Sequence, residues 1–157
     1  MPTWNEFAWG VLLFWAMSDQ NQSYQRLIRN HELLNALRTN PGGVTVEQIR
    51  EYIVGRFLNV WQCRLERTDT VAQAIKDQLV QLHPCLHALG AYDVETVDFG
   101  ANIFVDEHNI SVSQACEKCY NTLRHNINHR FAGTATSKLL HLLKPSLFVM
   151  WDQKTLG

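Results

Sequence analysis

The chain has 157 residues, of which 46% are hydrophobic and 18% are charged. This length suits one domain with an ordinary core, and the composition is neither that of a disordered chain nor that of a membrane protein. The longest apolar run, Trp9–Met17, is too short to span a membrane and follows no basic residue, so it is also a poor signal peptide. We therefore expect a soluble, cytoplasmic protein with no membrane contact and a single helical domain over residues 1–157.

The net charge of −1 is unevenly distributed along the chain. Residues 21–67 carry seven arginines against four glutamates, and residues 69–117 carry one lysine against eight acids. Residues 118–157 carry six lysines and arginines against one acid. A basic C-terminal segment beside an acidic middle indicates either an anionic partner or ordinary surface variation within one fold.

Helical periodicity dominates the N-terminal part of the chain. Apolar residues over 4–17 occupy every face of a helical projection, which predicts a helix that is buried nearly all round. The polar run 18–21 is expected to end that helix. A second helix is predicted over Ser23–Arg38, where Pro41-Gly42-Gly43 stops it.

Two further helices are predicted in the middle of the chain. Thr45 and Gln48 form a capping-box pattern ahead of an apolar helical face over 46–61. The next apolar stripe runs from about residue 69 to residue 82, and Pro84 is expected to break it.

The C-terminal half begins with a different pattern. Residues 91–110 predict a loop, with a short strand or hairpin near 93–106. Ser111 starts a second capping box and a clean helical stripe over 112–127, and a last short helix is expected from near Thr136 to before Pro145. The predicted fold class is therefore all-α, an irregular or orthogonal bundle of about six helices.

Two groups of cysteine and histidine residues have spacings that recur in metal sites. Cys116-x2-Cys119-x5-His125-x3-His129 offers zinc-type ligands, but nine helical steps place Cys116 and His125 on opposite faces. Both cysteines lie on the apolar stripe, which favours reduced core thiols.

The second group is His83-Pro84-Cys85-Leu86-His87. Its two histidines are four residues apart, which suits a metal on one helix, but Pro84 favours placing them in separate helices. A histidine near a helix C-terminus has a simpler role there, since it meets the negative end of the helix dipole. We predict no metal site and no cofactor.

The most specific pattern in the chain lies over residues 131–152. It consists of a predicted tight turn at 133–136, Lys138 at the start of an apolar helix, a stop at Pro145, an extended apolar piece and then Asp152. This order resembles the C-terminal part of the helix-hairpin-helix DNA glycosylases, in particular the 8-oxoguanine branch. In that family a hairpin leads into a helix that begins with a catalytic lysine, and a catalytic aspartate follows a proline-containing segment.

By position, the resemblance gives the catalytic roles to Lys138 and Asp152. It implies a DNA-repair hydrolase that binds double-stranded DNA, extrudes a damaged purine and cleaves its glycosidic bond. The lysine would attack the sugar as an amine nucleophile, the aspartate would stabilise the developing positive charge, and both would line one cleft. Contacts to phosphates are expected from backbone amides at a helix N-terminus and from basic side chains. These expected nucleic-acid-binding residues are Gly133, Thr134, Thr136, Ser137, Arg124, Arg130 and Lys144.

The chain departs from the family pattern at two points. The two hairpin glycines of the family are replaced here by Thr134 and Thr136. The family continues with a long helix after its aspartate, so the resemblance implies a chain that is truncated at its C-terminus. A purely structural interpretation has Thr136 capping a short helix, Lys138 in solvent and Asp152 capping whatever follows.

The alternative function is a non-enzymatic helical module that binds another protein. Its signature would be an exposed apolar patch around Trp4, Trp9 or Trp151. Trp4 lies on a helical stripe with Trp15, which favours core packing for those two residues instead.

Overall fold

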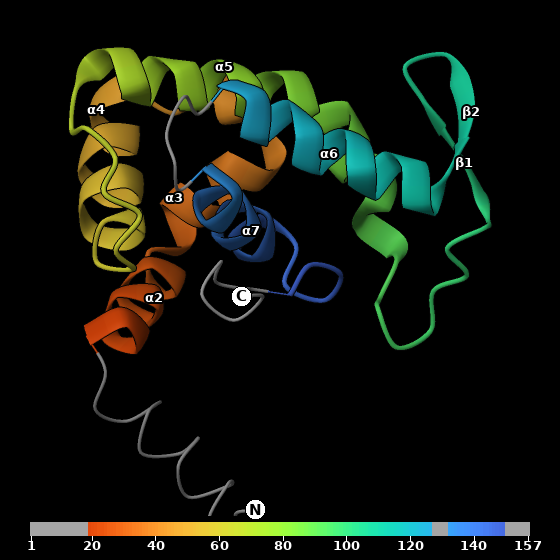
Figure 1. Cartoon of the computed structure of the whole chain (residues 1–157), viewed down its shortest axis with the longest axis horizontal. Helices are drawn as coiled ribbons and strands as arrows, with labels where there is room; N and C mark the ends of the chain where they lie inside the picture. Colours follow the sequence, from red (N-terminus) through yellow and green to blue (C-terminus); the bar gives the residue numbers. More distant parts are fainter. Residues whose placement is uncertain (1–18, 127–131, 150–157) are drawn as a thin grey trace, which may run out of the picture.

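The described part of the chain is built mainly from helices that cross one another, with one small hairpin at the edge (Figure 1). The computed structural model describes residues 19–126 and 132–149, so the helix predicted over 4–17 lies outside the described residues. None of the described helices is both long enough and apolar enough to cross a membrane. The elements in chain order are α2 (Asp19–Arg29), α3 (His31–Thr39), the 3₁₀ turn η1 (Pro41–Gly43), α4 (Val46–Gln48), the π-helix η2 (Ile49–Leu58), α5 (Asp69–Ala88), the 3₁₀ turn η3 (Leu89–Ala91), β1 (Asn102–Val105), β2 (His108–Ser111), α6 (Val112–Asn126) and α7 (Ala132–Leu143).

The helix predicted over Ser23–Arg38 is two helices, α2 and α3, separated at Asn30. The Asn30 side chain accepts a hydrogen bond from the Leu33 amide at 3.3 Å, which caps the N-terminus of α3. Asn30 therefore starts a new helix within a stretch of sequence that was predicted to form one continuous helix. The described chain is helical from Asp19, and the end of the helix predicted over 4–17 lies outside the described residues.

The capping box at Thr45 and Gln48 is confirmed. The Gln48 amide donates to Thr45 Oγ1 at 3.1 Å, and the Thr45 amide donates to Gln48 Oε1 at 2.9 Å. The helix that follows is not a simple α-helix, because after one α-helical turn the chain winds as the π-helix η2. At its end the Asn59 amide donates to the Val54 carbonyl, five residues back, at 3.0 Å. π-Helical segments are rare in proteins, and those that occur are often found at functional sites.

The predicted break at Pro84 is wrong, since α5 continues through this residue to Ala88. Proline removes the hydrogen bond to the carbonyl four residues earlier, which here belongs to Val80. Val80 is exposed, so water can satisfy its carbonyl. His83 and His87 consequently lie on one helix, with ring centroids 6.1 Å apart.

The hairpin is confirmed, with its first strand inside the predicted range 93–106 and its second strand just after it. β1 and β2 pair antiparallel, with Asn102 opposite Ser111 and Val105 opposite His108. Asp106 and Glu107 form the two-residue turn with φ angles of 48° and 67°, as a type I′ turn requires.

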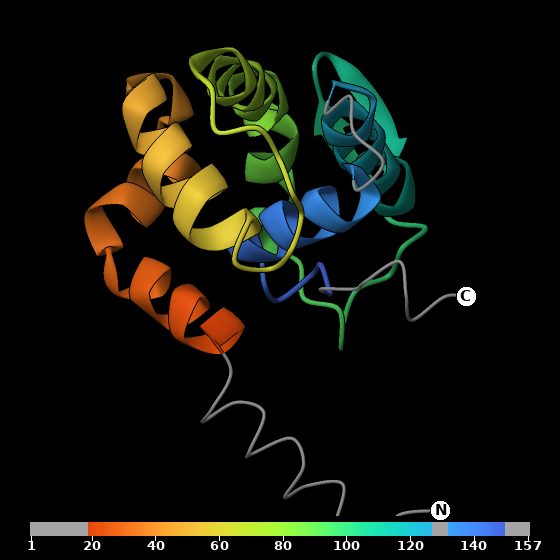
Figure 2. The same ribbon diagram turned by 60° about the vertical axis from the view of Figure 1, so that its left-hand side comes forward.

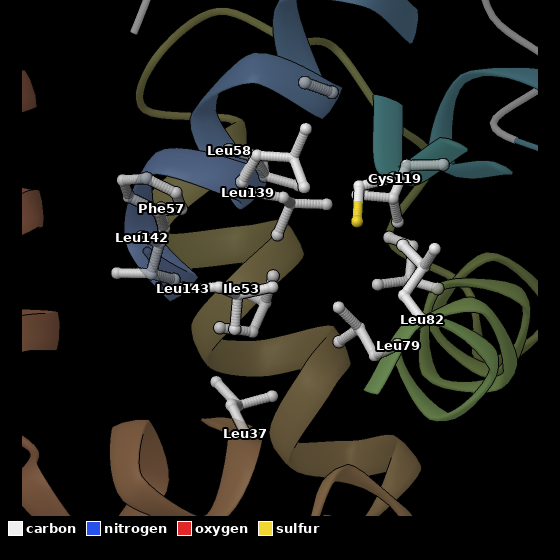
Figure 3. Packing of buried hydrophobic residues seen from close by; sticks show 14 of the residues in the cluster. Leu37, Ile53, Phe57, Leu58, Leu79, Leu82, Cys119, Leu139, Leu142 and Leu143 are labelled. Atoms are coloured by element: carbon white, nitrogen blue, oxygen red, sulfur yellow. The ribbon is translucent and has the colours of Figure 1, made fainter. Parts of the chain in front are cut away.

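The core is formed where α7 crosses beneath η2, α5 and α6 (Figure 2). Aliphatic side chains of α7 point between the other helices, so that almost every α7 residue from Gly133 to Leu143 is buried. The polar residues of this segment are consequently buried as well. Figure 3 shows the packing of the buried residues Leu37, Ile53, Phe57, Leu58, Leu79, Leu82, Cys119, Leu139, Leu142 and Leu143.

Candidate functional site

The candidate site is centred on the N-terminal half of α7. This helix begins at Ala132, four residues before the predicted start at Thr136, so the predicted tight turn over 133–136 is helical instead. The small side chains of this segment allow close packing against the neighbouring helices, and residues 133–137 are all buried. Ser137 donates its hydroxyl to the Thr134 carbonyl at 3.0 Å, which satisfies one buried polar group inside the helix.

Lys138 is a buried residue, with a relative exposure of 2%. Its Nζ lies 5.2 Å from the centroid of the Trp61 ring, which is within range for a cation–π interaction. The structural interpretation of Lys138 as a solvated residue is therefore wrong, and so is that of Thr136 as a helix cap. Lysine is almost never fully buried unless something specific stabilises it, which makes this position a functional candidate.

Trp61 is positioned by the loop that follows η2. The Asn59 side chain donates to the Leu65 carbonyl at 2.9 Å and accepts from the Leu65 amide at 2.8 Å. Between these two residues the chain reverses through Gln62 and Arg64, with φ angles of 60° and 52°. The Trp61 amide also donates to the Phe57 carbonyl at 3.1 Å, so both ends of the reversal are fixed.

Aromatic rings continue from Trp61 toward α2 and the end of α7. The Trp61 and Phe57 ring centroids are 6.3 Å apart, Phe57 and Tyr24 are 6.1 Å apart, and Tyr24 and His141 are 5.6 Å apart. Burial raises the pKa of Tyr24, against the opposing effect of the Arg38 charge. The sequence analysis missed this cluster because its members read as ordinary core residues on separate helical stripes.

Two buried polar atoms, one on the Trp61 ring and one on α7, have no hydrogen-bond partner within the described part of the chain. They are Trp61 Nε1 and Thr136 Oγ1. Gln78 Oε1 and His83 Nε2 of α5 share this property. Buried polar atoms are normally paired, so the unpaired indole N–H of Trp61, whose ring lies near Lys138 Nζ, is available to a polar group of a bound molecule.

The remaining predicted site residues are only partly brought together. Arg124 is exposed near the end of α6, with its guanidinium 5.9 Å from the Tyr120 ring centroid. Lys144 follows the C-terminus of α7, where it donates to the Gly90 carbonyl at 2.6 Å. A helix rises about 1.5 Å per residue, so Lys144 lies roughly 16 Å along α7 from Gly133. Lys144 is therefore placed at the opposite end of α7 from the predicted phosphate site.

Several predicted features lie outside the described residues. They include Arg130 and Asp152, and with the latter the expected cleft between Lys138 and Asp152. The same holds for the apolar patch around Trp4, Trp9 or Trp151 that would mark a protein-binding module.

The cysteines are free thiols, and their placement differs from the prediction in one respect. Cys119 is buried as expected, whereas Cys116 is only half-buried. The sequence analysis missed the partner of Cys119, which is Cys85 of α5 at an Sγ–Sγ distance of 3.3 Å. Among the residues that the structure describes, no group of three or more cysteines, histidines or carboxylates could hold a metal ion.

Cys116 is expected to react slowly with alkylating reagents near neutral pH. Burial raises the pKa of this thiol to about 11, and thiolate is the reactive form. Because the ordinary pKa of a cysteine thiol is 9.0, this rise leaves roughly a hundredfold less thiolate at pH 8. Peptide mapping after timed iodoacetamide treatment measures the rate, which should climb with pH up to about 11 in the folded protein. A rate at pH 8 equal to that of the urea-unfolded chain would contradict this.

Comparisons with known proteins return no match, whether with family models, with curated proteins or with solved structures. The candidate site is therefore defined by this chain's own geometry. Its members are Lys138, Trp61 and the adjoining aromatic cluster.

Proposed function

We propose that this protein acts on DNA as a glycosylase with lyase activity, using Lys138 as an amine nucleophile on the sugar of a damaged purine nucleotide. The observation that carries the proposal is the burial of Lys138 against Trp61 in the middle of α7. A lysine in this setting is held in one place and is shielded from water, which suits an amine that must meet a single carbon atom.

The proposed step is a displacement at the anomeric carbon. The Lys138 Nζ lone pair forms a bond to C1′ while the bond from C1′ to the purine nitrogen breaks. The base leaves with the bonding electron pair and takes up a proton. The nitrogen gives up its second proton to O4′ as the C1′–O4′ bond breaks and the C1′–N double bond forms. The resulting open-chain Schiff base can be hydrolysed by water or can undergo β-elimination.

Support for a nucleic-acid substrate comes from the sequence order of Lys138, an apolar stretch, Pro145 and Asp152, which is the order in the family that the sequence resembles. The hairpin of that family is replaced here, because residues 133–136 are helical and Lys138 lies six residues after the start of α7. In this proposal Asp152, which lies outside the described residues, supplies the carboxylate that stabilises positive charge on the sugar.

The proposal predicts that borohydride traps a covalent adduct between the protein and a DNA duplex that contains a damaged purine or an abasic site. Hydride addition converts the Schiff base to a stable amine, and peptide mapping should place the adduct on Lys138. Lys138→Met should abolish the adduct, whereas Lys144→Met should leave it unchanged. No adduct from folded wild-type protein on duplexes that it binds, or an adduct that persists in Lys138→Met, would overturn the proposed chemistry.

A further inference from the structure

A groove lies between α2 and η2. It has a volume of about 750 Å³. Val60 and Gln62, which flank Trp61 in the sequence, line one side of it. Ser23 also lines the groove, and its neighbour Tyr24 belongs to the aromatic cluster. The groove and the Lys138 site are therefore formed in part by the same two segments, residues 23–24 of α2 and residues 60–62 after η2.

Two arginines give this groove its chemical character. Arg26 of α2 and Arg56 of η2 line it, while Asp19 is the one carboxylate among its described lining residues. No ion pair is formed by either arginine within the described ranges, whereas Arg50 and Arg67 of the same region pair with Glu51. Among the described residues, the groove thus holds two guanidinium groups that form no ion pair.

The groove is also held in a fixed shape. The Ser23 hydroxyl donates to the Arg56 carbonyl and joins α2 to η2 directly. The Arg56 guanidinium lies 4.9 Å from the Tyr52 ring centroid, so the aromatic ring supports its position. The π-helical winding of η2 places these two residues, four apart, on one face. A guanidinium positioned like that of Arg56 is suited to phosphate, which it binds through paired hydrogen bonds, and Arg26 adds a second guanidinium to the same groove.

We infer that the α2–η2 groove binds phosphodiester groups of a nucleic-acid strand through Arg26 and Arg56. The inference rests on the proposed function, since the strand would be the one whose sugar meets Lys138. Backbone contacts of this kind fix the position of a strand without reading its sequence. The groove would hold phosphates near Trp61, while the nucleotide that reacts enters the Lys138 site.

The test is binding of a fluorescein-labelled duplex with one abasic site, measured by anisotropy over a range of salt concentrations. Arg26→Ala and Arg56→Ala should each weaken binding about tenfold and lower the slope of log affinity against log salt by about one. The matched control is Arg29→Ala, which removes the same charge from α2 outside the groove and should weaken binding no more than about twofold. Asp19→Asn, which removes the opposing charge, should tighten binding.

Three outcomes would overturn the inference. One is equal weakening by Arg26→Ala and Arg29→Ala, which would indicate a diffuse charge effect. Another is unchanged duplex binding in both groove variants. The third is that the groove variants lose binding of inorganic phosphate but keep binding of the duplex, which would mean that the groove binds a small anion. Borohydride trapping in the same samples separates the two proposals. If wild type is trapped but the groove variants bind the duplex normally, only the groove inference is refuted. If the groove variants weaken binding but wild type gives no trapped adduct, only the Lys138 chemistry is refuted.

Discussion

Reversing the charge of the buried lysine, in Lys138→Glu, is expected to lower the free energy of unfolding by about 3–5 kcal/mol at neutral pH. The introduced carboxylate would lose its hydration, because this position is buried. It would also face the Trp61 ring, whose electron-rich face attracts cations and repels anions. Burial raises the pKa of a carboxyl group, so the deficit should nearly vanish below about pH 4 and grow as pH rises toward 7. Urea denaturation at both pH values measures it.

The matched control for this experiment is Arg124→Glu. Arg124 also has its charge near an aromatic ring, that of Tyr120, but it is exposed on α6. Exposed cation–π pairs contribute less than about 1 kcal/mol, so this reversal should cost little. Lys138→Met, which removes the charge and keeps an unbranched side chain, should cost less than Lys138→Glu at neutral pH. Equal losses from the two charge reversals would mean that Lys138 is not buried in solution.

Elements with local signals could be predicted from the sequence. The capping boxes at Thr45 and Ser111 are visible because each uses side chains only three residues apart, and both form as expected. The strand over Asn102–Val105 was visible because β-prone residues precede a turn. The predicted break at Pro84 failed because a proline on an exposed helix side costs less than it does inside a core.

Features that depend on distant contacts could not be predicted. No residue pattern over η2 predicts a π-helix. The Trp61 ring lies near Lys138 only because folding brings two segments together that are distant in the sequence. Lys138 itself was found through the order of elements around it. Its burial had a further signal that the sequence analysis did not use, which is the run of small residues from Ala132 to Ser137 before it and the four leucines, interrupted only by His141, over residues 139–143 after it. A charge within such a run has no polar helix face on which to reach solvent.

Truncation of the aromatic cluster at its centre, in Phe57→Ala, is expected to lower the free energy of unfolding by about 3–5 kcal/mol. Phe57 is fully buried between the rings of Tyr24 and Trp61, so its removal leaves a cavity that backbone segments fixed by hydrogen bonds cannot close. The matched control is Phe104→Ala, which makes the same change at a ring that is 67% exposed on β1 and should cost less than about 0.5 kcal/mol. Chemical denaturation of both variants gives the comparison. Because Phe57 also supports Trp61, the first variant should change the tryptophan emission of the folded state, and similar losses in the two variants would contradict the central position of Phe57 in the core.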